Sequence, residues 1–157
     1  MRTSIRTGLS FGLNSGVITT LGLMIGLNAS TGSKLAVTGG ILTIAIADAL
    51  SDSLGIQASE ECKVKYTRNE IWQAVISTFF SKFFFALTFL IPVFLFDLPS
   101  AIKVSIVWAL LLITLFSIYI AKLEKSSISK SIYRHVILAV IVIILSQLAG
   151  NLINKLF

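Results

Sequence analysis

Five long apolar segments, separated by short polar ones, dominate the sequence. Each reaches the roughly 20 residues that an α-helix needs to cross a hydrocarbon layer about 30 Å thick. The scarcity of proline and the unbroken apolar runs favour helices over the alternating pattern of a membrane β-barrel. We therefore predict an all-α integral membrane bundle whose five spans cover residues 8–27, 35–57, 71–96, 101–121 and 136–157.

Composition narrows the class of protein further. Of 157 residues, 55% are hydrophobic and only 13% are charged, which excludes a water-soluble domain. The segments outside the spans are too short for a second domain, so residues 1–157 form one transmembrane unit. No Ser-His-Asp set, histidine cluster, phosphate-binding glycine loop or Cys-x-x-Cys pair occurs, so we expect no enzyme and no bound cofactor.

The distribution of lysine and arginine predicts the orientation. The formal net charge is +6, but the basic residues lie in short loops between apolar spans, which favours a lipid bilayer over nucleic acid as the partner. An N-terminus in the cytoplasm places most of them inside and the C-terminus outside, in the cell membrane if the source is prokaryotic. The inner group is Arg2, Arg6, Lys63, Lys65, Arg68, Lys122, Lys125, Lys130 and Arg134, and the outer group is Lys34, Lys103 and Lys155.

Three ionisable residues lie within the predicted spans, where a charge costs at least about 2.5 to 3.5 kcal/mol. Asp48 and Asp52 are four residues apart and therefore share one face of the second helix, with Ser51 beside them. Oxygen ligands of this kind suit a divalent cation or protons. Lys82 lies at the same depth in the third span, so its ammonium should face these carboxylates. It acts either as an internal counter-charge of a cation site or as half of a structural ion pair.

Two further patterns have alternative interpretations. Gly8, Gly12 and Gly16 repeat every four residues in the first span, which allows close helix approach either within the chain or at a homodimer interface. Glu60 and Glu61 end the second span at the inner side. They either gather cations from the cytoplasm or form an ordinary solvated helix end.

The first two spans carry motifs that suggest a family. The segment Phe11-Gly12-Leu13-Asn14-Ser15-Gly16-Val17-Ile18-Thr19-Thr20 and residues 47–60 resemble the vacuolar iron transporter family, also called the yeast calcium cross-complementer family. The corresponding family patterns are F-G-x-N-D-G-x-x-(S/T)-T and A-x-(A/G)-x-S-M-x-x-G-E-x-x-S. The resemblance implies five spans, a cytoplasmic N-terminus and a homodimer that exports Fe²⁺ or Mn²⁺ from the cytoplasm against protons.

The chain departs from the family at the residues that contact metal. Ser15 stands where the family has aspartate, Asp52 where it has methionine, and Ile56 where it has glutamate. Asp48 is an additional carboxylate, and the inner loop at residues 62–70 is shorter than the glutamate-rich region of the family. Without the thioether, the site shifts toward the harder ions Mn²⁺, Fe²⁺, Mg²⁺ or Ca²⁺.

Together these features predict a proton-coupled transporter of divalent metal cations. Asp48 and Asp52 would bind the ion, Lys82 would balance the charge, and neutral oxygens would come from Asn14, Ser15 and Ser51. The alternative is a non-transporting membrane scaffold or accessory subunit whose intramembrane charges only fasten the helices.

Overall fold

The computed structural model describes residues 3–62, 67–123, 125 and 127–156. Arg2, Lys63 and Lys65, predicted on the inner side, and Phe157, predicted in the last span, lie outside the described residues. Helices account for almost all of the described chain, and no strand occurs in it. The helices are α1 (Thr3–Thr31), α2 (Lys34–Glu61), α3 (Arg68–Thr88), α4 (Leu90–Leu95), α5 (Leu98–Leu123) and α6 (Ile128–Leu156).

The predicted all-α bundle is confirmed, with five helical segments long and apolar enough to cross a membrane. Each helix extends beyond the predicted apolar segment, most clearly α6, which begins at Ile128 rather than at residue 136. The added residues 128–135, about two helical turns, include serine, lysine and arginine, which hydropathy alone assigns to a loop. These polar residues continue the helix where it leaves the hydrocarbon layer.

Pro92 divides the third span into α3 and α4, as its position in the sequence predicts. Proline has no N–H group to bond the carbonyl of Thr88, four residues earlier. The helix therefore breaks at Phe89, whose N–H bonds the nearer carbonyl of Ala86 at 3.2 Å. Trp108 on α5 donates its indole N–H to the Thr88 hydroxyl at 3.1 Å, which ties the break to the neighbouring helix.

Asp97 occupies the turn before α5 and caps that helix. Its carboxylate accepts a hydrogen bond from the Ser100 N–H at 3.3 Å, and its carbonyl accepts the Ala101 N–H at 2.8 Å. Hydrogen bonds from the Ser100 side chain and backbone stabilise the ionised form and lower the pKa of Asp97. The sharp turn between α4 and α5 is therefore fixed by a charged cap.

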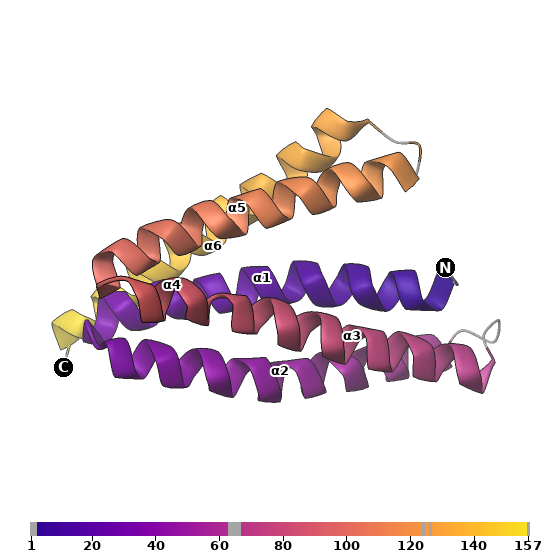
Figure 1. Cartoon of the computed structure of the whole chain (residues 1–157), viewed down its shortest axis with the longest axis horizontal. Helices are drawn as coiled ribbons and strands as arrows, with labels where there is room; N and C mark the ends of the chain where they lie inside the picture. The colour runs from indigo at the N-terminus through magenta and orange to yellow at the C-terminus, as the bar shows by residue number, and fades with distance from the viewer. Residues whose placement is uncertain (1–2, 63–66, 124, 126, 157) are drawn as a thin grey trace.

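Helix α1 is the central element of the bundle. It packs most extensively against α3 and also contacts α2, α5 and α6. Helices α5 and α6 run together and diverge from α1 toward the end of the bundle that carries the N-terminus (Figure 1). The bundle is consequently closed at one end and wedge-shaped at the other.

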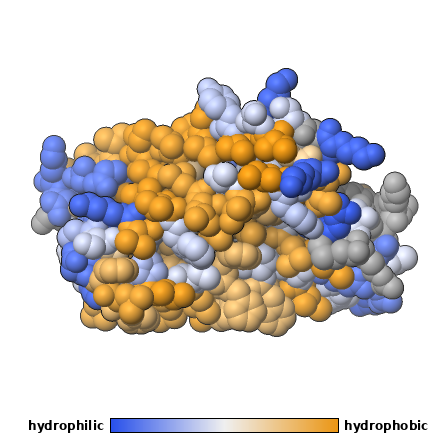
Figure 2. All heavy atoms as spheres, turned by 45° about the horizontal axis from the view of Figure 1, so that its top comes forward, coloured by the Kyte–Doolittle hydropathy of each residue, from blue (hydrophilic) through white to orange (hydrophobic). Residues whose placement is uncertain are grey.

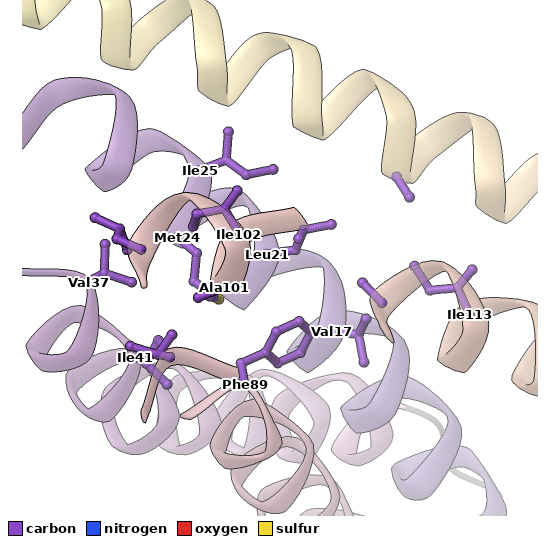
Figure 3. Packing of buried hydrophobic residues seen from close by; sticks show 14 residues of the cluster. Val17, Leu21, Met24, Ile25, Val37, Ile41, Phe89, Ala101, Ile102 and Ile113 are labelled. Atoms are coloured by element: carbon purple, nitrogen blue, oxygen red, sulfur yellow. The ribbon is translucent and has the colours of Figure 1, made fainter. Parts of the chain in front are cut away.

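The main hydrophobic core surrounds the C-terminal half of α1. Val17, Leu21, Met24 and Ile25 are almost fully buried there, and Phe89 inserts from the helix break (Figure 3). Helices α2 and α5 complete the cluster with Val37, Ile41, Ala101, Ile102 and Ile113. This packing holds the closed end of the wedge together.

The outer surface fits a lipid environment. Large apolar side chains such as Leu54, Phe84, Phe94 and Val107 are mostly exposed. Figure 2 shows a broad hydrophobic band between hydrophilic residues gathered at the two ends of the molecule. A surface of this kind is unfavourable in water and favourable in a bilayer. The protein is therefore a multi-pass membrane protein.

Candidate functional site

Lys82 is the centre of a polar cluster between α1, α2 and α3. Its side chain is only 1% exposed, which makes it one of the largest fully buried side chains of the protein. Its Nζ atom lies 2.6 Å from Asp48 Oδ2 and 2.9 Å from the Ser15 hydroxyl, and it also pairs with Asp52 Oδ2. The prediction that this ammonium faces both aspartates inside the bundle is confirmed.

Ser15 connects the cluster to α1. Its hydroxyl donates to Asp52 Oδ2 at 2.7 Å while its oxygen accepts from Lys82 Nζ. Lys82 and Asp48 form an ion pair, but Asp48 Oδ2 accepts no hydrogen bond from any described residue. Asp52 is thus held by charge and hydrogen bonds, whereas Asp48 is held by charge alone.

The two carboxylates are more accessible than the ammonium between them. The side chains of Asp48 and Asp52 are 28% and 21% exposed, against 1% for Lys82. Asp48 also lines a cavity of about 630 Å³ between α1 and α2, whose other walls include Leu23, Leu27 and Thr43. This cavity extends from Asp48 toward the end of the bundle opposite the N-terminus. The two carboxylates therefore lie outside the packed core, beside a cavity whose other lining residues are mostly apolar.

The predicted neutral oxygens divide between separate parts of the bundle. Ser15 joins the carboxylates, but Asn14 lies on another face of α1 and lines a cavity beside α5 and α6. Ser51 is exposed on α2. Among the described residues no hydrogen bond joins Asn14 or Ser51 to Lys82, so their role as further oxygen ligands stays a prediction.

The two inner glutamates also differ in environment. Glu60 is 5% exposed and has interaction partners, so its carboxylate is not open to the solvent. Glu61 is exposed and accepts a hydrogen bond from Gln57 Nε2 at 2.9 Å. Of the predicted pair, only Glu61 lies at the surface where a cation could first be attracted.

The glycine stripe of α1 faces α3 within the same chain. A Cβ atom on Gly12 would lie 2.6 Å from the Thr78 carbonyl oxygen, and one on Gly16 would lie 3.1 Å from Lys82 Cγ. Gly8 is equally tight against Ala74 and is buried. The prediction of a dimer interface along Gly8, Gly12 and Gly16 is therefore wrong. The stripe instead brings α1 close enough for Ser15 to reach Lys82.

The cluster offers few side chains that could bind a metal ion. Within residues 3–62, 67–123, 125 and 127–156 no group of three or more His, Cys, Asp or Glu side chains could hold a metal ion. A divalent cation at the cluster would find the carboxylates of Asp48 and Asp52 and the Ser15 hydroxyl, with the Lys82 ammonium already between them. Such an ion must displace or neutralise Lys82 to bind.

Comparisons with known proteins add no assignment, since no family model, curated protein or solved structure matches the chain.

Proposed function

We propose that the protein is a membrane transporter that exchanges divalent metal cations for protons at the Asp48, Asp52 and Lys82 cluster. The observation that carries the proposal is the convergence of two partly accessible carboxylates on one buried ammonium. A charge within a bilayer is costly, and a pure fastener needs only one carboxylate per lysine. The second carboxylate leaves one negative charge for a cargo cation or a proton to compensate.

Charge balance suggests how the exchange runs. Two ionised aspartates and one ammonium sum to −1, so the empty cluster becomes neutral when one aspartate is protonated. The cluster is also neutral with a divalent cation between ionised aspartates beside an uncharged Lys82. Compared with the empty neutral state, the cation-bound state has lost one proton from an aspartate and one from Lys82. Because neutral states carry the smallest burial cost, we expect exchange of one divalent cation for two protons without net charge movement.

The oxygen-rich donor set favours hard or borderline divalent ions, among which the family resemblance points to Fe²⁺ and Mn²⁺. The cavity of about 630 Å³ beside Asp48 offers space for a hydrated ion on the side away from the N-terminus. With the N-terminus in the cytoplasm, that side is extracytoplasmic. Export from the cytoplasm is the direction that the resemblance implies.

A homodimer fits this proposal, but along α2 rather than α1. Exposed small residues recur every four positions on α2, and Cβ atoms on Gly39 and Gly55 would meet no described atom within 4 Å. The partly exposed Asp48 and Asp52 flank this stripe. A second copy packed there would remove these carboxylates from lipid and enclose the cation path. The stripe consists of Gly39, Thr43, Ala47, Ser51 and Gly55.

The alternative is a scaffold or accessory subunit in which the cluster only fastens α1, α2 and α3. One observation favours it: Lys82 already contacts both carboxylates and Ser15, so a cation must compete with an ammonium held on three sides. The two functions differ in what the charges must do. A fastener can be replaced by neutral groups of similar size, whereas a transport site cannot.

Flux measurements in proteoliposomes separate these functions. The purified chain is reconstituted, and uptake of Mn²⁺, Fe²⁺, Mg²⁺ and Ca²⁺ is followed with and without a pH gradient. Asp48→Asn and Asp52→Asn each leave one carboxylate to balance Lys82, so both variants should fold but lose at least about tenfold in flux. Asp97→Asn removes a carboxylate outside the membrane and serves as the matched control, with unchanged flux expected.

A charge-free variant completes the test. Asp48→Asn, Asp52→Asn and Lys82→Met together remove the cluster without leaving an unpaired charge, and size-exclusion chromatography reports whether the chain still folds. The transport proposal expects folded protein without flux. Undiminished flux in this variant, or no flux of any of the four ions in the wild type, would refute the proposal and favour the scaffold.

A further inference from the structure

A polar cavity that shares no lining residue with the cavity beside Asp48 lies at the N-terminal end of the bundle. It encloses about 490 Å³ between α1, α5 and α6, where α5 and α6 diverge from α1 (Figure 1). Its charged and titratable lining groups are Arg6, Arg134 and His135, and no carboxylate of the described residues contributes to its wall. A cavity with this lining repels cations, so the proposed transport function does not account for it.

The two guanidinium groups are available to a ligand. Neither Arg6 nor Arg134 forms an ion pair with a described residue. The ion pairs seen in the described part of the chain are those of Lys82 with Asp48 and Asp52. Guanidinium groups hold phosphate oxygens through paired, charge-assisted hydrogen bonds. His135 is fixed beside them, because its Nδ1 atom contacts the Ser117 hydroxyl at 3.0 Å and the Ser131 carbonyl at 2.9 Å. The cavity therefore presents two guanidinium groups beside an imidazole ring whose position is fixed.

Neutral polar groups extend the same wall. Thr3, Thr7 and Ser10 line the cavity along α1. Asn14 lies at the end of this wall farthest from the N-terminus, where Asn14 Oδ1 is buried without a hydrogen-bond partner among the described residues. Hydroxyl groups near two guanidiniums suit the ester oxygens and hydroxyls of a polar head group.

An apolar cavity lies next to this polar one, beside α5. It encloses about 390 Å³ between α1, α3 and α5 and shares Arg6, Ser10 and Phe116 with the polar cavity. The remainder of its lining is mostly apolar and aromatic: Leu9, Leu13, Phe85, Leu112, Leu115 and Tyr119, together with Ser81. The two cavities are therefore neighbours, one cationic and one hydrophobic, and are together called the amphipathic groove below.

We propose that this groove binds an anionic phospholipid of the cytoplasmic leaflet. The phosphate lies between Arg6 and Arg134, and an acyl chain follows the apolar part under α5. Anionic lipids concentrate at the cytoplasmic surface, where the charge distribution places this end of the bundle. A free phosphate ester would use only the cationic part and leave the apolar part unfilled. The occupied groove fills the wedge between the α1–α2–α3 group and the α5–α6 pair.

Binding to the purified full-length chain in neutral detergent tests the proposal. Native mass spectrometry and thermal unfolding compare phosphatidylglycerol with phosphatidylcholine of the same acyl chains and with soluble glycerol phosphate. We expect phosphatidylglycerol alone to bind and to raise the unfolding temperature. Arg6→Gln combined with Arg134→Gln should weaken this binding roughly tenfold or more, since each change removes a charge-assisted contact.

Matched variants identify which property matters. Arg68→Gln with Lys130→Gln removes two exposed charges from the same end of the bundle but from outside the cavity, and should change binding by less than about twofold. Arg6→Lys with Arg134→Lys keeps the charge and should give intermediate binding. Equal binding of phosphatidylcholine, equal stabilisation by glycerol phosphate, or an equal effect of the control pair would each overturn the proposal. None of these measurements depends on cation flux.

Discussion

Substitution of Gly12 by alanine tests the close approach of α1 and α3 on which the cation cluster depends. The added Cβ atom would lie 2.6 Å from the Thr78 carbonyl oxygen and 2.9 Å from Ser81 Cβ, whereas ordinary contact begins near 3.4 Å. The nearest obstacle is backbone, so a rotamer change cannot relieve the clash. The two helices must separate by several tenths of an ångström.

The free-energy cost follows from two opposing contributions. Overpacking of a tight interface costs about 1 to 3 kcal/mol, while alanine gains up to about 1 kcal/mol over glycine in helix propensity. Separation also strains the hydrogen bond from the Ser81 hydroxyl to the Leu9 carbonyl, which is 3.0 Å long. We therefore expect Gly12→Ala to destabilise the protein by about 1 to 2 kcal/mol.

Gly26→Ala is the matched control on the same helix. Its Cβ would meet the Ser146 carbonyl at 3.7 Å, an ordinary contact, so stability should stay equal or rise by up to about 1 kcal/mol. Both variants are compared with the wild type by thermal unfolding in detergent, followed by fluorescence-detected size-exclusion chromatography. Equal unfolding temperatures for Gly12→Ala and Gly26→Ala would refute the proposed packing of α1 on α3.

Three further changes probe the cluster and the helix ends. Ser15→Ala removes the hydroxyl between Lys82 and Asp52 and should cost about 1 to 3 kcal/mol in thermal unfolding, whereas exposed Ser51→Ala should stay within about 0.5 kcal/mol. Gly150→Ala places a Cβ atom 2.5 Å from a carbonyl oxygen of α1, so faster hydrogen exchange in α6 is expected, and unchanged exchange would contradict the contact. Asp97 stabilises α5 fully above pH 3.8, and this contribution should disappear as the pH falls through its lowered pKa. Circular dichroism should show that acid-dependent loss of helix in the wild type but not in Asp97→Ala.

Several features of this protein follow from the sequence because they depend on local pattern. The length and hydropathy of each apolar segment determine that it spans the bilayer as a helix, since no other open structure satisfies its backbone there. Pro92 breaks its helix because it lacks an N–H group. Helical periodicity also places Asp48 and Asp52 on one face, and span depth places Lys82 level with them.

The tertiary structure decided which faces meet. The spacing of Gly8, Gly12 and Gly16 is equally compatible with a helix contact within the chain and with one between two chains. Only the packing of α1 against α3 distinguishes these two possibilities. The same rotation of α1 turns Ser15 toward Lys82 and Asn14 toward the separate cavity near α6. Sequence alone does not fix the rotation of a membrane helix, because lipid and neighbouring helices are similarly apolar. Close packing of small and polar side chains selects one rotation, and that choice determines which oxygens surround the buried ammonium.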